Sequence, residues 1–343
     1  MKKPYGSSIL DGENPTFTSE IVNIPELGDG QVLLKTVYLS NDPAQRTWIS
    51  PLANPERLYL PPVQLGETMK AMGISRVVES RSSSIPTGSL VTGLPGWTEY
   101  SIDDAKNVYP LNPQPGLPET HFLGSLGLPG LTAYYALYEI VKASSKDAIV
   151  VSGAAGAVGS MVVQIAKKMI GCRKVIGIAG TDEKCRWVKR LGADVCLNYK
   201  KAEFKEQLTK ETDGFVEILS AYPSDNVGGE ILDFMLTRLA RFGRVAACGT
   251  IANYNRDSDI TGLKNFFEVI TMRLQILGFI NIDWIEHLPE VQDILIKEWK
   301  KGTLIIGDES ETIVDAKFAD IPRAWMTLYS GGNTGKLITK LQD

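Results

Sequence analysis

The sequence contains few of the residues that hold metals or disulfides. Its 343 residues include only two histidines, His121 and His287, and four cysteines. The cysteines are Cys172, Cys185, Cys196 and Cys248. No two of them have the spacing of a metal-ligand or redox pair, and four are too few for a disulfide framework in a chain of this length. We therefore expect reduced thiols in a cytoplasmic protein, histidines with structural or surface roles, and no metal site.

A strong charge of one sign and long apolar stretches are also missing. Lys and Arg number 36 and Asp and Glu 40, a net charge of −4, which does not favour binding to nucleic acid or to an anionic membrane. No apolar stretch is long enough to span a bilayer, and the first residues, MKKPYGSSIL, lack the apolar core of a secretory signal. Length and composition predict a globular protein of two or three domains.

The first part of the chain is typical of short strands and turns. The segments Gln31–Leu39, Ile74–Val78 and Ser89–Thr92 are apolar and bounded by turn residues, which predicts an antiparallel, barrel-like domain. The proline-dense segment Tyr109–Pro118 predicts an irregular connector. The tail, Asp308–Asp343, returns to strand-and-turn character, and we expect it to rejoin the first domain.

From Ala148 onward, strands and helices alternate, which predicts a parallel sheet with helices on both faces. The predicted strands are Ala148–Ser152, Lys174–Ala179, Asp194–Asn198, Arg244–Cys248 and Leu274–Ile280. The predicted helices are Ala157–Met169, Asp182–Leu191 and Gly229–Ala240. We expect this α/β domain to span residues 127–302, with residues 1–126 and 303–343 forming the other domain.

A glycine-rich turn joins the first predicted strand of the α/β domain to its helix. The dinucleotide fingerprint needs small residues for a tight turn, for close approach of the backbone to pyrophosphate, and for helix–strand packing. Ala154, Gly156 and Gly159 hold these places, with alanine as a variant in the first. The N–H groups of the following helix are suited to receive the pyrophosphate. This context predicts a Rossmann-type, doubly wound domain that binds a dinucleotide, with a turn used only for packing as the alternative.

The end of the second predicted strand favours NADP(H) over NAD(H). An NAD site carries an acidic residue about 20 residues past the turn, to bond the ribose hydroxyl. In the run Ile178–Lys184 no carboxylate stands at the strand end. The small residues there leave space for a 2′-phosphate, with Thr181 and Lys184 nearby, and Asp182 is predicted to be the N-cap of the next helix. The alternative for Lys184 is a solvated helix lysine.

These segments resemble the zinc-independent medium-chain dehydrogenases/reductases, and among them the alkenal/one double-bond reductases, which include prostaglandin reductases, plant double-bond reductases and bacterial curcumin reductases. The resemblance runs from Thr36 to the C-terminus through blocks in the family order, including LSNDPAQR, YLPP, GWTEYS, GLPGLTAYYAL, SGAAGAVGS and GNTGKLITK. It implies a GroES-like, mostly antiparallel β-barrel catalytic domain beside the Rossmann domain. It also implies NADPH as cofactor and a small conjugated carbonyl compound as substrate.

The resemblance further implies roles for individual cofactor residues. Lys184 and Tyr199 match positions that hold the adenosine 2′-phosphate, Asn333 matches a tail residue near the cleft, and Thr132 lies in a block beside the cofactor. The residues expected to contact the cofactor are Thr132, Ala154, Gly156, Ala157, Val158, Gly159, Gly180, Thr181, Lys184, Tyr199, Asn226, Cys248, Gly249, Tyr254, Phe279 and Asn333.

The implied reaction delivers hydride to the β-carbon of an α,β-unsaturated aldehyde or ketone and a proton to the α-carbon. Negative charge develops on the carbonyl oxygen, and a hydrogen-bond donor aimed at that oxygen lowers the barrier. By family position Tyr254 is the expected catalytic residue, orienting or protonating the enolate directly or through water, with the nicotinamide ribose hydroxyl as the other candidate donor. Tyr59, Trp48 and Tyr254 are the expected substrate-binding residues. For either tyrosine, the alternative is a half-buried packing residue.

The chain departs from the zinc-containing relatives, since SNDPAQR and LGETMKAMG stand where those have a cysteine and a Gly-His-Glu block, and the four-cysteine lobe is absent. The catalytic metal is therefore missing by ligand count. The segment Tyr222–Gly229 carries one residue more than the usual family run, and LGET lacks an expected glycine-rich pattern.

Three alternatives to an enone reductase stay open: an NADPH quinone oxidoreductase, a secondary-alcohol dehydrogenase, and a non-catalytic NADPH-binding protein. The missing metal disfavours the alcohol dehydrogenase, because an alkoxide needs stabilisation. The resemblance implies a homodimer joined around Leu274–Ile280, an apolar edge strand that needs cover.

Overall fold

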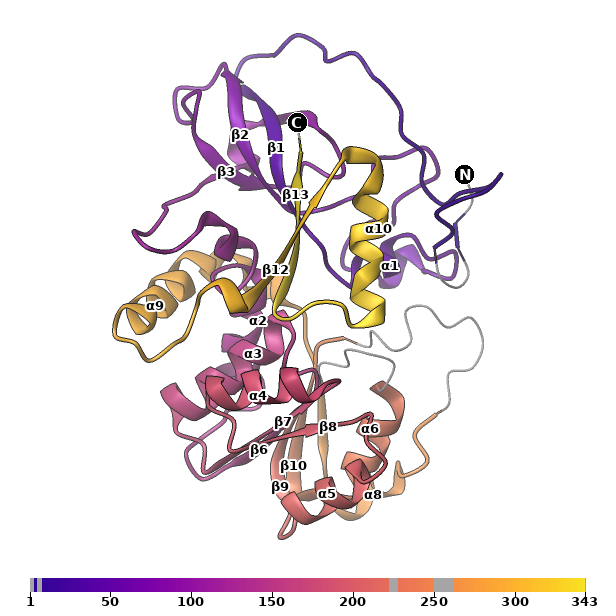
Figure 1. The fold of residues 1–343 in the computed structure, drawn as a ribbon, viewed down its shortest axis with the longest axis vertical. Coiled ribbons are helices and arrows are strands. Elements are labelled where there is room, and N and C mark those ends of the chain that lie inside the picture. The colour runs from indigo at the N-terminus through magenta and orange to yellow at the C-terminus, as the bar shows by residue number, and fades with distance from the viewer. Residues whose placement is uncertain (1–2, 5–7, 222–227, 250–261, 343) are drawn as a thin grey trace.

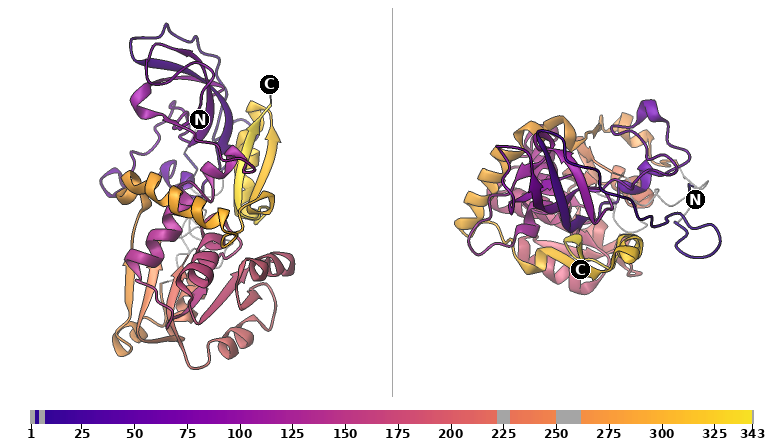
Figure 2. Two further views of the ribbon diagram at one scale, coloured as in Figure 1. Left: turned by 90° about the vertical axis from the view of Figure 1, so that its left-hand side faces the viewer. Right: turned by 90° about the horizontal axis from the view of Figure 1, so that it is seen from above.

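The computed structural model describes residues 3–4, 8–221, 228–249 and 262–342. They form two lobes with one large β-sheet in each, one lobe above the other in Figure 1. The side view in Figure 2 shows the same arrangement, with helix α9 (Leu288–Lys300) at mid-height between the two sheets. Among the helices of the described ranges, none combines the length and apolar content that crossing a membrane requires.

The upper lobe is built on a mostly antiparallel sheet. Its strands are β1 (Gln31–Ser40), β2 (Gly73–Ser80), β3 (Leu90–Gly93), β4 (Tyr100–Asp104), β5 (Tyr109–Pro110), β12 (Glu311–Ala316) and β13 (Lys336–Leu341). The strand order is β12-β13-β1-β2-β3-β5, and β4 pairs with the first half of β1. Strand β13 pairs with the last residues of β1, so the C-terminal segment adds to the sheet formed by the first part of the chain.

Three details of this lobe differ from the sequence predictions. Segment 109–118 is not wholly irregular, because Tyr109 and Pro110 form β5 at the sheet edge, where proline is tolerated. Strand β4, with the sequence YSIDD, was not predicted because its alternation is largely polar. The tail also contains helix α10 (Ile321–Met326), which packs against β12 and β13.

The lower lobe contains a parallel sheet. Its strands are β6 (Ala148–Val151), β7 (Lys174–Ala179), β8 (Val195–Asn198), β9 (Val216–Ala221), β10 (Leu239–Ala247) and β11 (Gln275–Gly278). Within the described residues their order is β11-β10-β9-β6-β7-β8, and every neighbouring pair is parallel. This is the strand order of the Rossmann fold, with the reversal between β6 and β9. The predicted fold class, a doubly wound parallel sheet with a mostly antiparallel second domain, is confirmed.

Helices cover both faces of the parallel sheet. Helices α2 (Leu128–Tyr135), α3 (Ala157–Gln164), α4 (Asp182–Leu191) and α9 contribute to the core on one face; α5 (Phe204–Glu211), α6 (Gly228–Leu236) and α8 (Phe267–Thr271) contribute to the other. Residues of β6 alternate between the two cores, with Ile149 and Val151 in the first and Val150 in the second. A strand that is buried on both faces has a continuous run of apolar residues, and this pattern predicted β6.

Helix α4 has the predicted bounds, but Asp182 is its first residue and not its N-cap. The cap is Thr181, whose hydroxyl oxygen accepts a 3.2 Å hydrogen bond from the Lys184 N–H. The predicted helix 229–240 ends at Leu236, because the chain enters β10 at Leu239. The predicted helix 157–169 is α3 followed by a π-helical segment.

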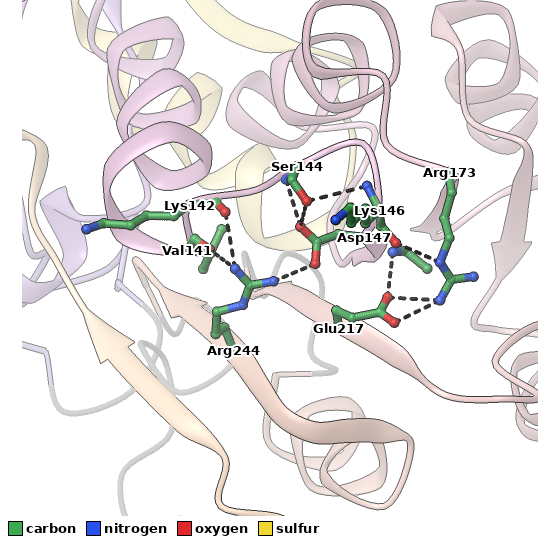
Figure 3. A network of polar contacts seen from close by, with 9 residues as sticks. Val141, Lys142, Ser144, Lys146, Asp147, Arg173, Glu217 and Arg244 are labelled. Carbon is green, nitrogen blue, oxygen red and sulfur yellow. Dashed lines mark hydrogen bonds and ion pairs between the residues drawn. The ribbon is translucent and has the colours of Figure 1, made fainter.

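An ion-pair network holds the edge of the parallel sheet where its strands begin (Figure 3). Arg244 donates a 2.6 Å hydrogen bond to Asp147, which also accepts 2.7 and 2.9 Å bonds from the N–H and hydroxyl of Ser144. Arg173 makes two 2.9 Å hydrogen bonds to the carboxylate of Glu217. Ligands of open α/β sheets bind at the opposite, carboxyl edge, so this network has a structural role.

Candidate cofactor and substrate site

The glycine-rich turn closes tightly after β6. Gly153 has a φ of +59°, and its carbonyl oxygen accepts a 2.9 Å hydrogen bond from the Gly156 N–H. A Cβ on Gly159 would lie 2.3 Å from that same carbonyl oxygen, so only glycine lets α3 approach the turn this closely. The Ala154 N–H donates a 3.0 Å hydrogen bond to the carbonyl of Ile178 on β7. Gly153, whose left-handed backbone makes the turn, was not among the predicted site residues.

The start of α3 is free of side-chain caps. Gly156 is the N-cap and has no side chain to bond the first N–H groups, which include those of Ala157 and Val158. Such N–H groups point out of the helix end and carry partial positive charge. They lie at the carboxyl edge of the sheet, beside the reversal of strand order between β6 and β9. This is the arrangement that binds the pyrophosphate of a dinucleotide.

The upper lobe reaches this turn through its C-terminal segment. The Gly335 N–H donates a 2.8 Å hydrogen bond to the Ala155 carbonyl, and Gly335 forms a parallel bridge with Gly156. The side-chain amide of Asn333 donates a 2.8 Å hydrogen bond to the Gly335 carbonyl. Asn333 therefore lies two residues from a direct contact with the glycine-rich turn, and its role beside the cofactor stays a prediction.

Lys184 and Tyr199 come together at the carboxyl ends of β7 and β8. The Tyr199 N–H donates a 3.1 Å hydrogen bond to the Ala179 carbonyl at the end of β7. Lys184, in the first turn of α4, donates a 2.9 Å hydrogen bond from Nζ to the Gly331 carbonyl. Gly180 and Thr181 connect β7 to α4 at the same corner. The residues predicted for the 2′-phosphate therefore share one corner, next to the loop that carries Asn333.

Asp182, the first residue of α4, carries a carboxylate that is already paired. Asp182 accepts a 3.0 Å hydrogen bond from the side-chain amide of Asn198 and forms a 2.9 Å ion pair with Lys201. These hydrogen bonds, that of Lys201 being the larger cause, hold the pKa of Asp182 below its ordinary value. A carboxylate engaged in this way is poorly placed to bond a ribose hydroxyl, as an NAD site requires.

The other predicted cofactor residues follow neighbouring strands or lie on α2. Cys248 and Gly249 come directly after β10, and Phe279 comes directly after β11 at the same sheet edge. Thr132 on α2 is buried, and its hydroxyl accepts a 3.0 Å hydrogen bond from the side-chain amide of Asn281. Because this hydroxyl also donates to a backbone carbonyl of its own helix, Thr132 is engaged within the protein. Asn281 was not among the predicted site residues.

Trp48 and Tyr59, the described residues of the predicted substrate pocket, contact one another. The indole Nε1 of Trp48, at the end of α1 (Gln45–Trp48), donates a 3.3 Å hydrogen bond to the Tyr59 hydroxyl. Trp48 is 6% exposed and belongs to a core that includes Trp97 and Trp325, whereas Tyr59 is 39% exposed. The buried indole of Trp48 thus fixes the hydroxyl of Tyr59, while part of the Tyr59 ring stays accessible. An accessible aromatic ring held in this way is suited to contact a flat apolar compound.

Tyr254 and Asn226 lie outside the described residues, as does most of segment 222–229, so their roles stay predictions. Within the described ranges, no group of three or more His, Cys, Asp or Glu side chains could hold a metal ion. His121 is fully buried, and its Nδ1 lies 2.8 Å from a carboxylate oxygen of Glu311 on β12. This histidine has the structural place that was expected for it.

Comparisons with known proteins agree with this geometry. Residues 11–111 match a family described as the N-terminal domain of oxidoreductase, and residues 157–297 match one described as zinc-binding dehydrogenase. Fold and site together define a medium-chain dehydrogenase/reductase.

Individual relatives narrow this class. The chain is 37% identical to prostaglandin reductase 1 of Bos taurus, over 95% of this chain and 94% of the relative. It is 34% identical to the NADPH-dependent curcumin reductase of Escherichia coli, over 99% of this chain and 94% of the relative. The structure of CurA from Vibrio vulnificus, solved in complex with NADPH, superposes on this chain with a TM-score of 0.86 and 32% sequence identity. The match covers 100% of this chain and 98% of CurA. The chain belongs to the zinc-independent alkenal reductase family that contains the prostaglandin and curcumin reductases.

Proposed function

We propose that this protein is an NADPH-dependent reductase of the C=C bond of α,β-unsaturated aldehydes and ketones. The observation that carries the proposal is the meeting of the two lobes at the glycine-rich turn, where the Gly335 N–H bonds the Ala155 carbonyl. A dinucleotide site at this place lies beside the upper lobe, which supplies the aromatic pair Trp48 and Tyr59. The names of the relatives support this reading over a quinone reductase.

The residues of the site fit NADPH. The uncapped start of α3 suits the pyrophosphate, and the corner of Thr181, Lys184 and Tyr199 offers a cation and hydrogen-bond donors to the 2′-phosphate. Asp182, the nearby acid, is paired with Lys201. We assign residues 127–302 to the domain that holds the cofactor and residues 1–126 and 303–343 to the domain that completes the cleft.

When bound, NADPH supplies the hydride that reaches the β-carbon of the substrate. Tyr254 is the proposed catalytic residue, and its hydroxyl donates a hydrogen bond to the substrate carbonyl oxygen as negative charge develops there. Trp48 fixes the hydroxyl of Tyr59, so that the Tyr59 ring forms one wall of the substrate pocket. An apolar wall of this kind accepts conjugated substrates without a specific polar contact.

We also propose that the protein is a cytoplasmic homodimer, joined through β11. This strand is the edge of the parallel sheet, and its Ile276 is 39% exposed. Phe267 and Ile270, on the helix α8 that leads into β11, are 70% and 62% exposed. An apolar edge strand with exposed apolar neighbours needs a covering partner, and a second copy of the chain provides one.

NADPH consumption with a substrate panel tests the function. The panel contains a conjugated enal, a conjugated enone, their saturated counterparts and a quinone. The proposal expects oxidation of NADPH with the enal and the enone and none with the saturated compounds. Faster consumption with the quinone than with every enone identifies a quinone reductase instead, and no consumption with any compound contradicts the proposal.

A further inference from the structure

Lys336 is a buried lysine at the start of β13, directly after the glycine that contacts the glycine-rich turn. Its side chain is only 4% exposed. The ammonium group donates a 3.0 Å hydrogen bond to the Asn41 carbonyl and forms a 2.5 Å ion pair with the carboxylate of Asp42. Since a lysine is almost never fully buried unless it is paired, these two contacts explain why its charge is tolerated here.

The ion pair links β13 to the chain that follows β1. Lys336 has a second carboxylate beside it in the sheet, because Glu311 on β12 is its register partner. The Glu311 carboxylate is engaged elsewhere: it accepts a 2.6 Å hydrogen bond from the Thr120 hydroxyl and lies 2.8 Å from Nδ1 of His121. The charge of Lys336 is therefore directed to Asp42.

Asp42 begins the turn that leads into α1. Its N–H donates a 2.8 Å hydrogen bond to the side-chain oxygen of Gln45, and its carbonyl accepts a 3.2 Å bond from the Gln45 N–H. Gln45 is fully buried and is the first residue of α1. The last residue of α1 is Trp48, whose indole donates to the hydroxyl of Tyr59. A path of hydrogen bonds and one short helix thus runs from Lys336 to the aromatic ring proposed for the substrate pocket.

Gly335 holds the other end of this path. Its φ is +63°, and a Cβ there would lie 1.9 Å from the Ser310 carbonyl oxygen, so the backbone is tightly confined at this position. Its N–H bonds the Ala155 carbonyl in the glycine-rich turn of the lower lobe. Lys336, one residue further, therefore stands between the turn proposed for the pyrophosphate and the chain that leads to the proposed substrate wall.

We propose that Lys336 is a positioning residue for hydride transfer, and that its ion pair with Asp42 sets the place of the substrate relative to the cofactor. Reacting atoms must lie about 3–3.5 Å apart for transfer. The glycine-rich turn belongs to the lower lobe and the aromatic pair to the upper lobe, so their separation depends on contacts that tie one to the other. Lys336 acts through Asp42 and α1, without touching either reactant. The inference rests on the proposed function.

Single-turnover reduction of an enone by enzyme-bound NADPH tests this role, because its rate constant does not depend on the fraction of protein that is folded. Lys336→Met keeps the apolar stem and removes the ammonium group. The rate constant is expected to fall at least about tenfold, since a small misplacement of the reacting atoms is costly, while the dissociation constant for NADPH stays that of the wild type. Lys340→Met, at an exposed lysine of the same strand, is the matched control and should keep the wild-type rate constant.

Variants of Asp42 test the same contact from its other side. Asp42→Ala should lower the rate constant as Lys336→Met does, and Asp42→Asn, which retains an acceptor oxygen, should restore part of it. Because both substitutions remove one contact, the double variant should be no slower than the slower single variant. Losses that multiply in the double variant contradict a joint role. Either position decides the test by itself when variants of the other do not fold.

An isotope effect identifies the step that slows. With NADPH deuterated at the transferable C4 position, Lys336→Met should show a primary isotope effect at least as large as that of the wild type, and a smaller one overturns the inference. A wild-type rate constant in Lys336→Met overturns it as well. A raised NADPH dissociation constant with an unchanged rate constant does the same and makes Lys336 a cofactor-binding residue. Wild-type protein that oxidises no NADPH with any enone contradicts the proposed function before any variant is compared.

Discussion

The ammonium group of Lys184 donates a 2.9 Å hydrogen bond to the backbone carbonyl of Gly331, which connects α4 of the lower lobe to a loop of the upper lobe. That loop continues to Asn333 and then to Gly335, which contacts the glycine-rich turn. The cation proposed for the 2′-phosphate thus stands where both lobes meet the cofactor site. If Lys184 binds the 2′-phosphate as proposed, its ammonium group takes part both in cofactor binding and in the contact between the lobes.

Lys184→Ala should weaken NADPH binding much more than NADH binding. A hydrogen bond to a charged group contributes about 1.5–3 kcal/mol, which corresponds to roughly a tenfold to hundredfold rise in the NADPH dissociation constant. Titration of both cofactors measures the difference, and Lys189→Ala, an exposed lysine of the same helix, is the matched control. Equal losses for both cofactors argue against the phosphate role.

Tyr254→Phe should lower kcat well beyond its effect on NADPH affinity. Loss of one donor to a developing oxyanion typically costs about 2.7–4 kcal/mol, or about 10²–10³ in kcat. Steady-state kinetics with an enone measure the effect, and Tyr109→Phe, at a tyrosine that is 64% exposed, is the control. Unchanged turnover removes Tyr254 from the mechanism.

Tyr59→Ala should raise the KM for apolar enones and leave the KM for NADPH unchanged. It removes the aromatic wall, whereas Tyr59→Phe keeps the ring and removes only the hydroxyl that accepts from Trp48. An aromatic contact is worth about 0.5–1.5 kcal/mol beyond its buried area, so the alanine variant should show the larger effect. Identical KM values for the wild type and both variants place Tyr59 outside the pocket.

Asp147→Asn should destabilise the protein and leave cofactor binding intact. The Asp147 side chain is 8% exposed and pairs with Arg244 at 2.6 Å, so the substitution leaves a mostly buried guanidinium without its counter-charge. We expect a loss of about 1–3 kcal/mol in the free energy of unfolding, measured by urea denaturation. Glu309→Gln, which breaks an exposed ion pair with Arg190, should cost about 0–1 kcal/mol. A changed NADPH affinity in Asp147→Asn contradicts a purely structural role for this edge of the sheet.

Helix α4 and the first strands of the parallel sheet could be predicted because short stretches of sequence specify them. The bounds of α4 follow from its apolar spacing and from the glycine after Leu191, and the first strands of the parallel sheet follow from continuous apolar runs. Helix α9 was not predicted, although its Val291 and Leu295 are buried in the core of the lower lobe. Strand β9 was not predicted; it begins directly after Phe215, whose backbone is left-handed.

The sequence allows the residues of the candidate site to be predicted, but it does not show which of them contact one another. The glycine-rich turn and Lys184 can be recognised in the sequence, because fingerprint and charge are local properties. The partner of Lys184, Gly331, lies far along the chain and is brought to it only by the assembly of the two lobes.

The most direct test of the central claim follows the hydride to its destination. A conjugated enone is reduced with NADPH carrying deuterium at the transferable C4 position, and the product is examined by NMR. The account predicts a saturated ketone with one deuterium on the β-carbon and an intact carbonyl group. Deuterium on the hydroxyl-bearing carbon of an allylic alcohol, or no transfer of deuterium from NADPH, contradicts it.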